Sequence, residues 1–284
     1  MSVPDPWGSL RPSFGPAALG PVGRSQPVRA IPGNLRRVDL FTWRSRSPSG
    51  TNSPTASASI WQSPQCGRTM RATTLHDPDQ RALARRELAR SDPRLAAAMR
   101  HYDDPWPTRR RSAIATLARI LVGQQISVNA AATIYGRLAA RCGGQITAAG
   151  LDQLGETDLH GCGLSRQKRA GLKDLSTRTL DGRINPGQLW RLDDEGVRNA
   201  VTSVRGLGPW SAEIYMMFGL GRPDLLPLDD LGLRAGFARL LGRRKPPAPR
   251  TMLNTARPWR PWRTLACLYL WALLDNPPAS TEKT

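Results

Sequence analysis

A glycine-rich turn and a pair of carboxylates are the residues of this chain best placed to do chemistry. Gly206-Leu207-Gly208-Pro209 combines two glycines with a proline, which predicts a tight turn that leads at once into a helix. The free backbone N–H groups at the start of that helix could bind a phosphate. Further on, Pro227-Leu228-Asp229-Asp230 opens another helix, whose dipole favours an ionised carboxylate at Asp230. A phosphate site and a carboxylate one helix apart would allow a protein to hold DNA and act on its sugar.

Apolar residues at helical spacing predict the elements that position these groups. One helix leads into the turn and another follows it, so the unit is helix, hairpin, helix. Asp230 stands near the start of a third helix. The three apolar stripes are Val197, Ala200, Val201 and Val204; Ile214, Met217 and Phe218; and Leu233, Phe237, Leu240 and Leu241.

The same periodicity predicts helices through most of the remaining chain, and no alternating strand pattern of useful length interrupts it. Asp92-Pro93 and Ser165 are expected to begin two of these helices, and Gly161-Cys162-Gly163 to break the chain. We therefore predict an all-α domain over residues 76–284. The further helices are expected at 82–90, 93–102, 114–123, 128–138, around Leu151 and Leu154, after Ser165, and at 262–274.

The first 75 residues differ from the rest in composition. Residues 1–70 contain ten prolines and eleven serines, with eight arginines against two aspartates. Such a segment cannot bury enough apolar surface to offset its chain entropy, so we predict a disordered tail. The alternatives are a misassigned extension before a true start at Met70 and a loose electrostatic arm on DNA.

Net charge and cysteine spacing narrow the class of partner and cofactor. A net charge of +19 favours a polyanion, most simply nucleic acid, over a generally basic protein. The cysteines at 66, 142, 162 and 267 lie far apart, so no iron–sulfur cluster is expected. The three histidines lack metal-ligand spacing, and no apolar run is long enough to cross a membrane.

Together with the hairpin, three further motifs resemble the helix-hairpin-helix DNA glycosylases, and most of all the DNA-3-methyladenine glycosylase II branch. They are Gly123-Gln124-Gln125-Ile126-Ser127, Gly163-Leu164-Ser165-Arg166-Gln167-Lys168, and Trp259-Arg260-Pro261-Trp262-Arg263 leading into Tyr269-Leu270-Trp271. The resemblance covers roughly residues 90 to 275. It implies a two-lobed helical fold and hydrolysis of the N-glycosidic bond of alkylated purines such as 3-methyladenine and 7-methylguanine. A glycosylase for uracil, hypoxanthine or oxidised guanine, or a non-catalytic DNA-binding module, remains open.

The resemblance also assigns roles to single residues. Asp230 becomes the catalytic carboxylate, because Arg234 supplies the basic residue that the family carries four positions later; Asp229 would be a second cap. Trp210, Tyr215 and Trp271 are expected to form an aromatic base pocket. The family's tyrosine stands four residues after the tryptophan, whereas Ile214 occupies that position here, so the pocket's substrate range stays open.

Two loops would then contact damaged double-stranded DNA. Gln125 is expected to be the wedge that fills the place of an extruded base, with Gln124 supporting it, although a plain polar connection would read the same locally. The expected phosphate ligands are Gly206, Gly208, Ser211, Arg166 and Lys168.

Trp210 stands where family members with lyase activity carry a lysine, so a monofunctional enzyme is predicted. The resemblance implies no organic cofactor and allows a monovalent cation held by hairpin carbonyls. We further expect a monomer in the bacterial cytoplasm, associated with the nucleoid through DNA.

Overall fold

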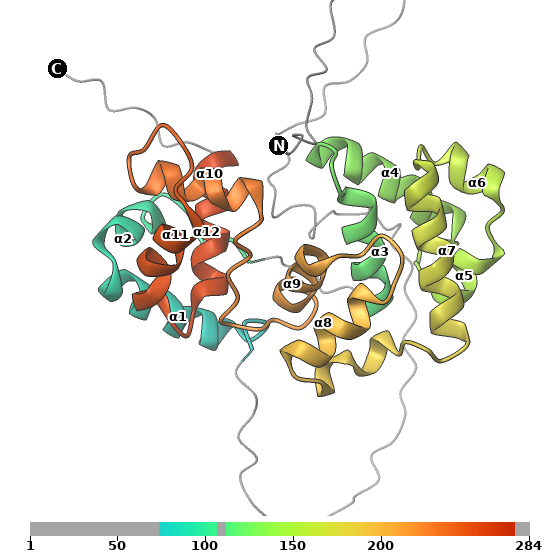
Figure 1. Ribbon diagram of the computed structural model, residues 1–284, viewed down its shortest axis with the longest axis horizontal. Helices are drawn as coiled ribbons and strands as arrows, with labels where there is room; N and C mark the ends of the chain where they lie inside the picture. Colours follow the sequence, from blue (N-terminus) through green and yellow to red (C-terminus); the bar gives the residue numbers. More distant parts are fainter. Residues whose placement is uncertain (1–73, 107–111, 276–284) are drawn as a thin grey trace, which may run out of the picture. The chain divides into compact units, whose positions relative to one another are not determined.

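The computed structural model describes residues 74–106 and 112–275, and within these ranges every regular element is a helix (Figure 1). The α-helices are α1 (Pro78–Ser91), α2 (Pro93–Met99), α3 (Ala113–Gly123), α4 (Val128–Arg141), α5 (Ala148–Gln153), α6 (Glu156–Gly161), α7 (Arg166–Leu180), α8 (Asp194–Thr202), α9 (Pro209–Phe218), α10 (Leu231–Leu240), α11 (Pro249–Ala256) and α12 (Arg263–Asp275). Two 3-10 helices, η2 (Pro186–Arg191) and η3 (Arg257–Trp259), complete the set.

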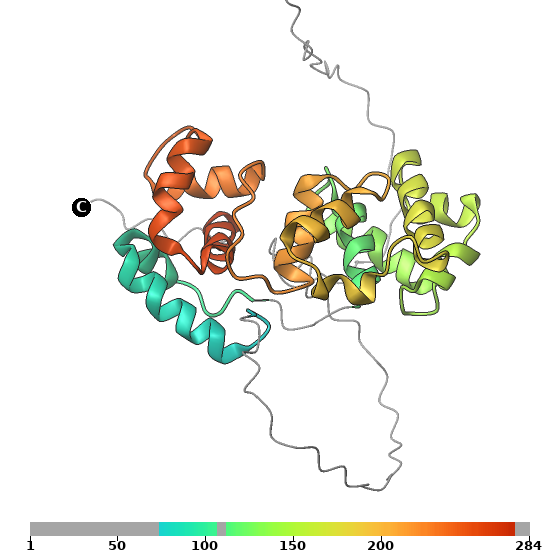
Figure 2. The ribbon, with the colours of Figure 1, turned by 60° about the horizontal axis from the view of Figure 1, so that its bottom comes forward.

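The first group of helices joins the two ends of the described chain, because α1 and α2 pack against α10, α12 and η3 (Figure 2). α10 and α12 can approach closely because Gly236 has no side chain: a Cβ there would lie 2.8 Å from the carbonyl oxygen of Leu270. The Trp259 ring stacks on Phe237 at 5.3 Å between centroids. Its indole N–H donates to the buried carboxylate of Asp92, the N-cap of α2, at 3.1 Å. This group is therefore fixed by backbone contact and by a buried polar bond.

The second group is organised around α3, which packs against α4, α7 and α9 and has nearly all of its residues buried. α7 lies close to α3 at Gly171, where a Cβ would come within 2.6 Å of both the Leu121 side chain and the Arg205 carbonyl oxygen. α5 and α6 pack on α7, and α8 packs on α9. The hairpin therefore rests directly on α3 and α7.

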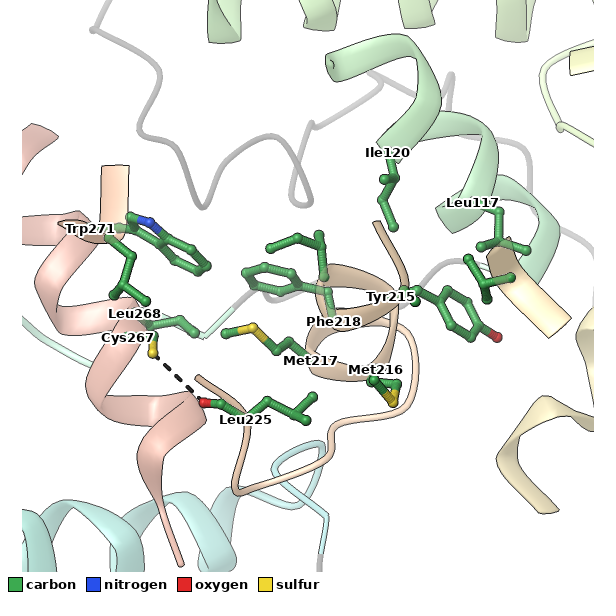
Figure 3. Close-up of a cluster of buried hydrophobic side chains, with 14 of the residues drawn as sticks. Leu117, Ile120, Tyr215, Met216, Met217, Phe218, Leu225, Cys267, Leu268 and Trp271 are labelled. Carbon is green, nitrogen blue, oxygen red and sulfur yellow. Dashed lines mark hydrogen bonds between the residues drawn. The ribbon is translucent and has the colours of Figure 1, made fainter. Parts of the chain in front are cut away.

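Helix α9 contributes side chains to both groups. Figure 3 shows Phe218 directed toward Trp271 of α12, and Tyr215 directed toward Leu117 of α3. The rings of Phe218 and Trp271 stack with centroids 6.0 Å apart and planes inclined by 22°. One apolar core is therefore continuous through both groups.

The predicted all-α fold is confirmed for the described residues, and the helices pack in two groups. The predicted boundaries at Gly123, Ser165 and Asp230 coincide with helix ends. The short helices α6 and α11 were not predicted, because about two turns carry too little periodicity. Residues 1–73 of the predicted tail lie outside the described residues. Leu75 was placed in that tail, but it is fully buried and its N–H donates to the Gly221 carbonyl at 2.8 Å.

Candidate active site

The hairpin joins α8 to α9 and leaves the start of α9 open. Gly206 has φ +82°, a left-handed conformation that only glycine adopts without strain. Gly208 is the N-cap of α9 and supplies no side-chain cap, so the first N–H groups of the helix have no such partner. A Cβ at Gly208 would meet nothing within 4 Å, so internal packing does not require glycine there. An outside group can therefore approach this backbone closely.

Asp230 is held by three N–H donors at the start of α10. Its Oδ1 accepts the Leu233 backbone N–H at 2.5 Å, which makes Asp230 the N-cap. The same oxygen accepts the indole N–H of Trp271 at 2.9 Å, and Oδ2 accepts that of Trp210 at 2.9 Å. The neighbouring Asp229 is exposed instead. Of the two carboxylates, Asp230 is thus the one with a fixed orientation.

This carboxylate lines a cavity of about 920 Å³. Trp210 and Trp271 line it together with Phe218, which stacks on Trp271. The loop of residues 123–127 borders the same cavity, so the predicted wedge and the predicted catalytic group share one space. The volume lies within the range of typical small-molecule sites, and a planar ring could stack on the indoles.

The 123–127 loop is tied to the hairpin by a side chain. Gln124 Nε2 donates to the Gly206 carbonyl at 2.8 Å and to Ser211 Oγ at 3.0 Å. The next residue, Gln125, is exposed and has φ +57°. It is the one non-glycine residue with positive φ in the described part of the chain, a strained conformation of the kind that concentrates at functional sites.

Three predicted site residues lie elsewhere than expected. Tyr215 does not line the cavity; it is 1 % exposed, and its hydroxyl donates to the Pro186 carbonyl at 3.5 Å. The Ser211 hydroxyl is buried and faces Gln124, so it is not presented to a phosphate. Lys168 Nζ donates to the carbonyls of Val122 and Gln124, both at 2.8 Å, and so points into the protein.

Arg166, in contrast, is exposed. It lines a separate hollow of about 480 Å³ with three further cations, Arg169, Lys173 and Arg205. Since Arg205 directly precedes the hairpin glycine, this basic hollow lies beside the predicted phosphate site. The predicted role of Arg166 at DNA phosphates remains a prediction.

Several cavity residues were not predicted, among them Phe218, Leu231 and Arg119. Phe218 could have been found by spacing, because Trp210, Ile214 and Phe218 are each four residues apart and share one face of α9. Leu231, 77 % exposed at the start of α10, carries no sequence signal beyond its place next to Asp230. Arg119 is 2 % exposed and lies over the Tyr135 ring at 4.7 Å. The sequence signal that could have identified Arg119 is its charge within the otherwise apolar run of α3.

The described residues contain neither a side-chain cluster suited to a metal ion nor a helix that could cross a membrane. No group of three or more His, Cys, Asp or Glu side chains there is arranged to hold a metal ion. None of the helices described is long and apolar enough to cross a bilayer. The carbonyl oxygens of Val204 and Gly206 each accept one hydrogen bond, from Leu207 N–H and Gln124 Nε2. Each keeps a second lone pair for a monovalent cation, which remains a prediction.

Comparison with known proteins identifies the class to which this hairpin, capped aspartate and all-helical fold belong. Residues 118–261 match the HhH-GPD superfamily of base excision DNA repair proteins, and the chain belongs to that superfamily. Among solved structures it is similar to the 3-methyladenine DNA glycosylase Mag1 of Schizosaccharomyces pombe in complex with abasic DNA. The TM-score is 0.63 at 27 % identity, over 69 % of this chain and 100 % of that one.

Two curated relatives are similar in sequence. YfjP of Bacillus subtilis is 33 % identical over 123 residues, which are 43 % of each chain. AlkA of Mycobacterium tuberculosis, described as a probable bifunctional transcriptional activator and DNA repair enzyme, is 34 % identical over 172 residues. The match covers 56 % of this chain and 33 % of AlkA. The chain thus spans less than half the length of both relatives.

Proposed function

We propose that this protein is a monofunctional DNA glycosylase that removes alkylated purines from double-stranded DNA. The observation that carries the proposal is Asp230, held by two indole N–H groups in a cavity that a flipped purine could enter. The structural relative Mag1 is named a 3-methyladenine DNA glycosylase and was solved with abasic DNA, the product of such a reaction.

In the proposed reaction the bond between C1′ of the deoxyribose and the purine nitrogen breaks, and the base leaves with the electron pair. Positive charge builds on the sugar, and the ionised Asp230 beside it stabilises that charge. The oxygen of a water molecule then bonds to C1′, and Asp230 can accept the proton that this water loses. An alkylated, cationic purine leaves as a neutral base, so modest catalysis suffices. The indoles of Trp210 and Trp271 attract that cation through their ring faces.

The proposed enzyme does not cut the DNA strand. Strand cleavage by this class needs a lysine amine that forms a Schiff base with the sugar. Trp210 occupies the corresponding position, and the chain has no lysine between Lys173 and Lys245. We also propose that the protein acts as a monomer, in the bacterial cytoplasm and on nucleoid DNA.

An excision assay on duplexes that each carry one defined lesion tests the proposal. We expect release of 3-methyladenine and 7-methylguanine, and an abasic strand that breaks only after added alkali. A covalent adduct trapped by borohydride would refute the monofunctional assignment. Preferential release of uracil or oxidised guanine would move the enzyme to another branch of the superfamily. Binding without any base release would favour the non-catalytic module.

A further inference from the structure

Lys168, in the first turn of α7, is half-buried and directs its ammonium toward the end of α3. Its ammonium donates to the carbonyl oxygens of Val122 and Gln124, which are 46 and 44 residues away in sequence. These carbonyls belong to the last turn of α3 and the residue after it, where no helical N–H remains to satisfy them. Burial lowers the pKa of the Lys168 ammonium, which agrees with its withdrawal from water. Lys168 therefore acts as a C-terminal cap supplied by another helix.

The same short loop is held from its other side. The side chain of Gln124 bonds to the hairpin at Gly206 and Ser211, while its carbonyl bonds to Lys168. Gln124 is thus fixed by backbone and side chain at once, directly before the strained Gln125. A residue with φ +57° relaxes unless its surroundings hold it, and these bonds are the ones that hold the residue before it.

We propose that Lys168 is a positioning residue for the wedge: its two bonds keep the 123–127 loop in the conformation in which Gln125 replaces an extruded base. This role rests on the proposed glycosylase function and replaces the phosphate contact that the sequence suggested. Loss of the ammonium leaves two carbonyls without a donor and allows Gln125 to leave its positive-φ conformation. Base extrusion should then suffer more than the chemical step, because the wedge offsets the pairing and stacking that extrusion breaks.

The experiment compares Lys168→Met with Lys173→Met. Lys173 is the matched control because it lies on the same helix and its replacement removes the same charge. Its ammonium also donates to a backbone carbonyl, that of Asp152 in α5, at 2.5 Å. Single-turnover excision is measured on two duplexes with one 7-methylguanine, opposite either cytosine or a tetrahydrofuran abasic analogue. For Lys168→Met we expect a loss about tenfold larger on the paired lesion than on the unpaired one. For Lys173→Met we expect the same factor on both duplexes.

The salt dependence of DNA binding separates positioning from phosphate contact. The slope of log K against log salt is negative, and a lost phosphate contact reduces its magnitude by about 1. We expect this reduction for Arg166→Met and not for Lys168→Met. The proposal would be overturned if Lys168→Met lost excision equally on the two duplexes, or if it reduced the magnitude of the salt slope by about 1. If that variant fails to fold, Lys168→Gln carries the test, because its shorter amide cannot reach both carbonyls, with the same selective loss on the paired lesion expected. No excision by the wild type would refute the proposed function instead.

Discussion

Replacing Asp230 by asparagine separates the carboxylate's charge from its structural role. Asparagine is as good an N-cap as aspartate, so the start of α10 should survive. All three donors of the site, however, point at carboxylate oxygens. The amide oxygen can take the place of Oδ1, which accepts two of them, and the amide NH₂ then faces the indole N–H of Trp210. Two opposed donors cost about 1–3 kcal/mol of folding free energy. For a domain of this size that lowers the Tm by roughly 2–4 °C per kcal/mol.

The rate should fall much further than the stability. Loss of one preorganised electrostatic group typically costs roughly 10²–10³ in rate, and we expect a loss of that size for Asp230→Asn. Single-turnover excision at saturating enzyme measures it. Fluorescence polarisation on abasic DNA should give an unchanged or tighter Kd, because a negative charge near DNA has been removed.

Asp229→Asn is the matched control. Asp229 is exposed, so its substitution should change the free energy of unfolding only slightly and the excision rate by about twofold or less. The assignment of the catalytic carboxylate fails if the two variants lose excision equally. It fails as well if Asp230→Asn retains a rate within about tenfold of the wild type while its Tm falls as expected.

Three further predictions concern acid stability, packing and base selection. Burial alone would raise the pKa of Asp92, but hydrogen bonds from Arg94 and Trp259 outweigh it and lower that pKa. The stability that Asp92 adds is therefore complete above about pH 4 and is lost as pH falls through the lowered pKa, so Asp92→Asn should weaken the acid dependence of the Tm below about pH 4. Gly236→Ala should lower the free energy of unfolding, because its Cβ would meet the α12 backbone. Gly136→Ala is the control: a Cβ there meets nothing within 4 Å, so urea titrations should show the free energy of unfolding raised by about 0.5–1 kcal/mol. Trp271→Phe keeps an aromatic ring but removes the bond to Asp230, so it should slow excision of all lesions. Trp271→Ala removes the ring as well and should slow 7-methylguanine more than neutral hypoxanthine; equal effects of Trp271→Ala on the two would refute selection by charge.

Local sequence signals predicted the helices and the position of Asp230 well, because periodicity and caps act within a few residues. Tyr215 was chosen for its aromatic ring, although the spacing from Trp210 points to Ile214 and Phe218. The predicted phosphate contact of Lys168 rests on the 163–168 motif, whereas its two acceptors in the structure are more than 40 residues away in sequence. No pattern within one helix could reveal that bond. The partnership of Asp230 with Trp271, 41 residues apart, likewise emerges only when α10 and α12 pack.

The two indole bonds to Asp230 also bear on how the lesion range can evolve. A substitution at Trp210 or Trp271 alters the cavity wall and the hold on the carboxylate together, so a gain for a new base carries a loss for every base. Ile126 and Leu231 border the same cavity with apolar side chains that cannot bond to a carboxylate. Both are exposed, so the fold tolerates other residues there. In the proposed enzyme, substitutions at these two positions should therefore change the cavity wall without altering the bonds that hold Asp230.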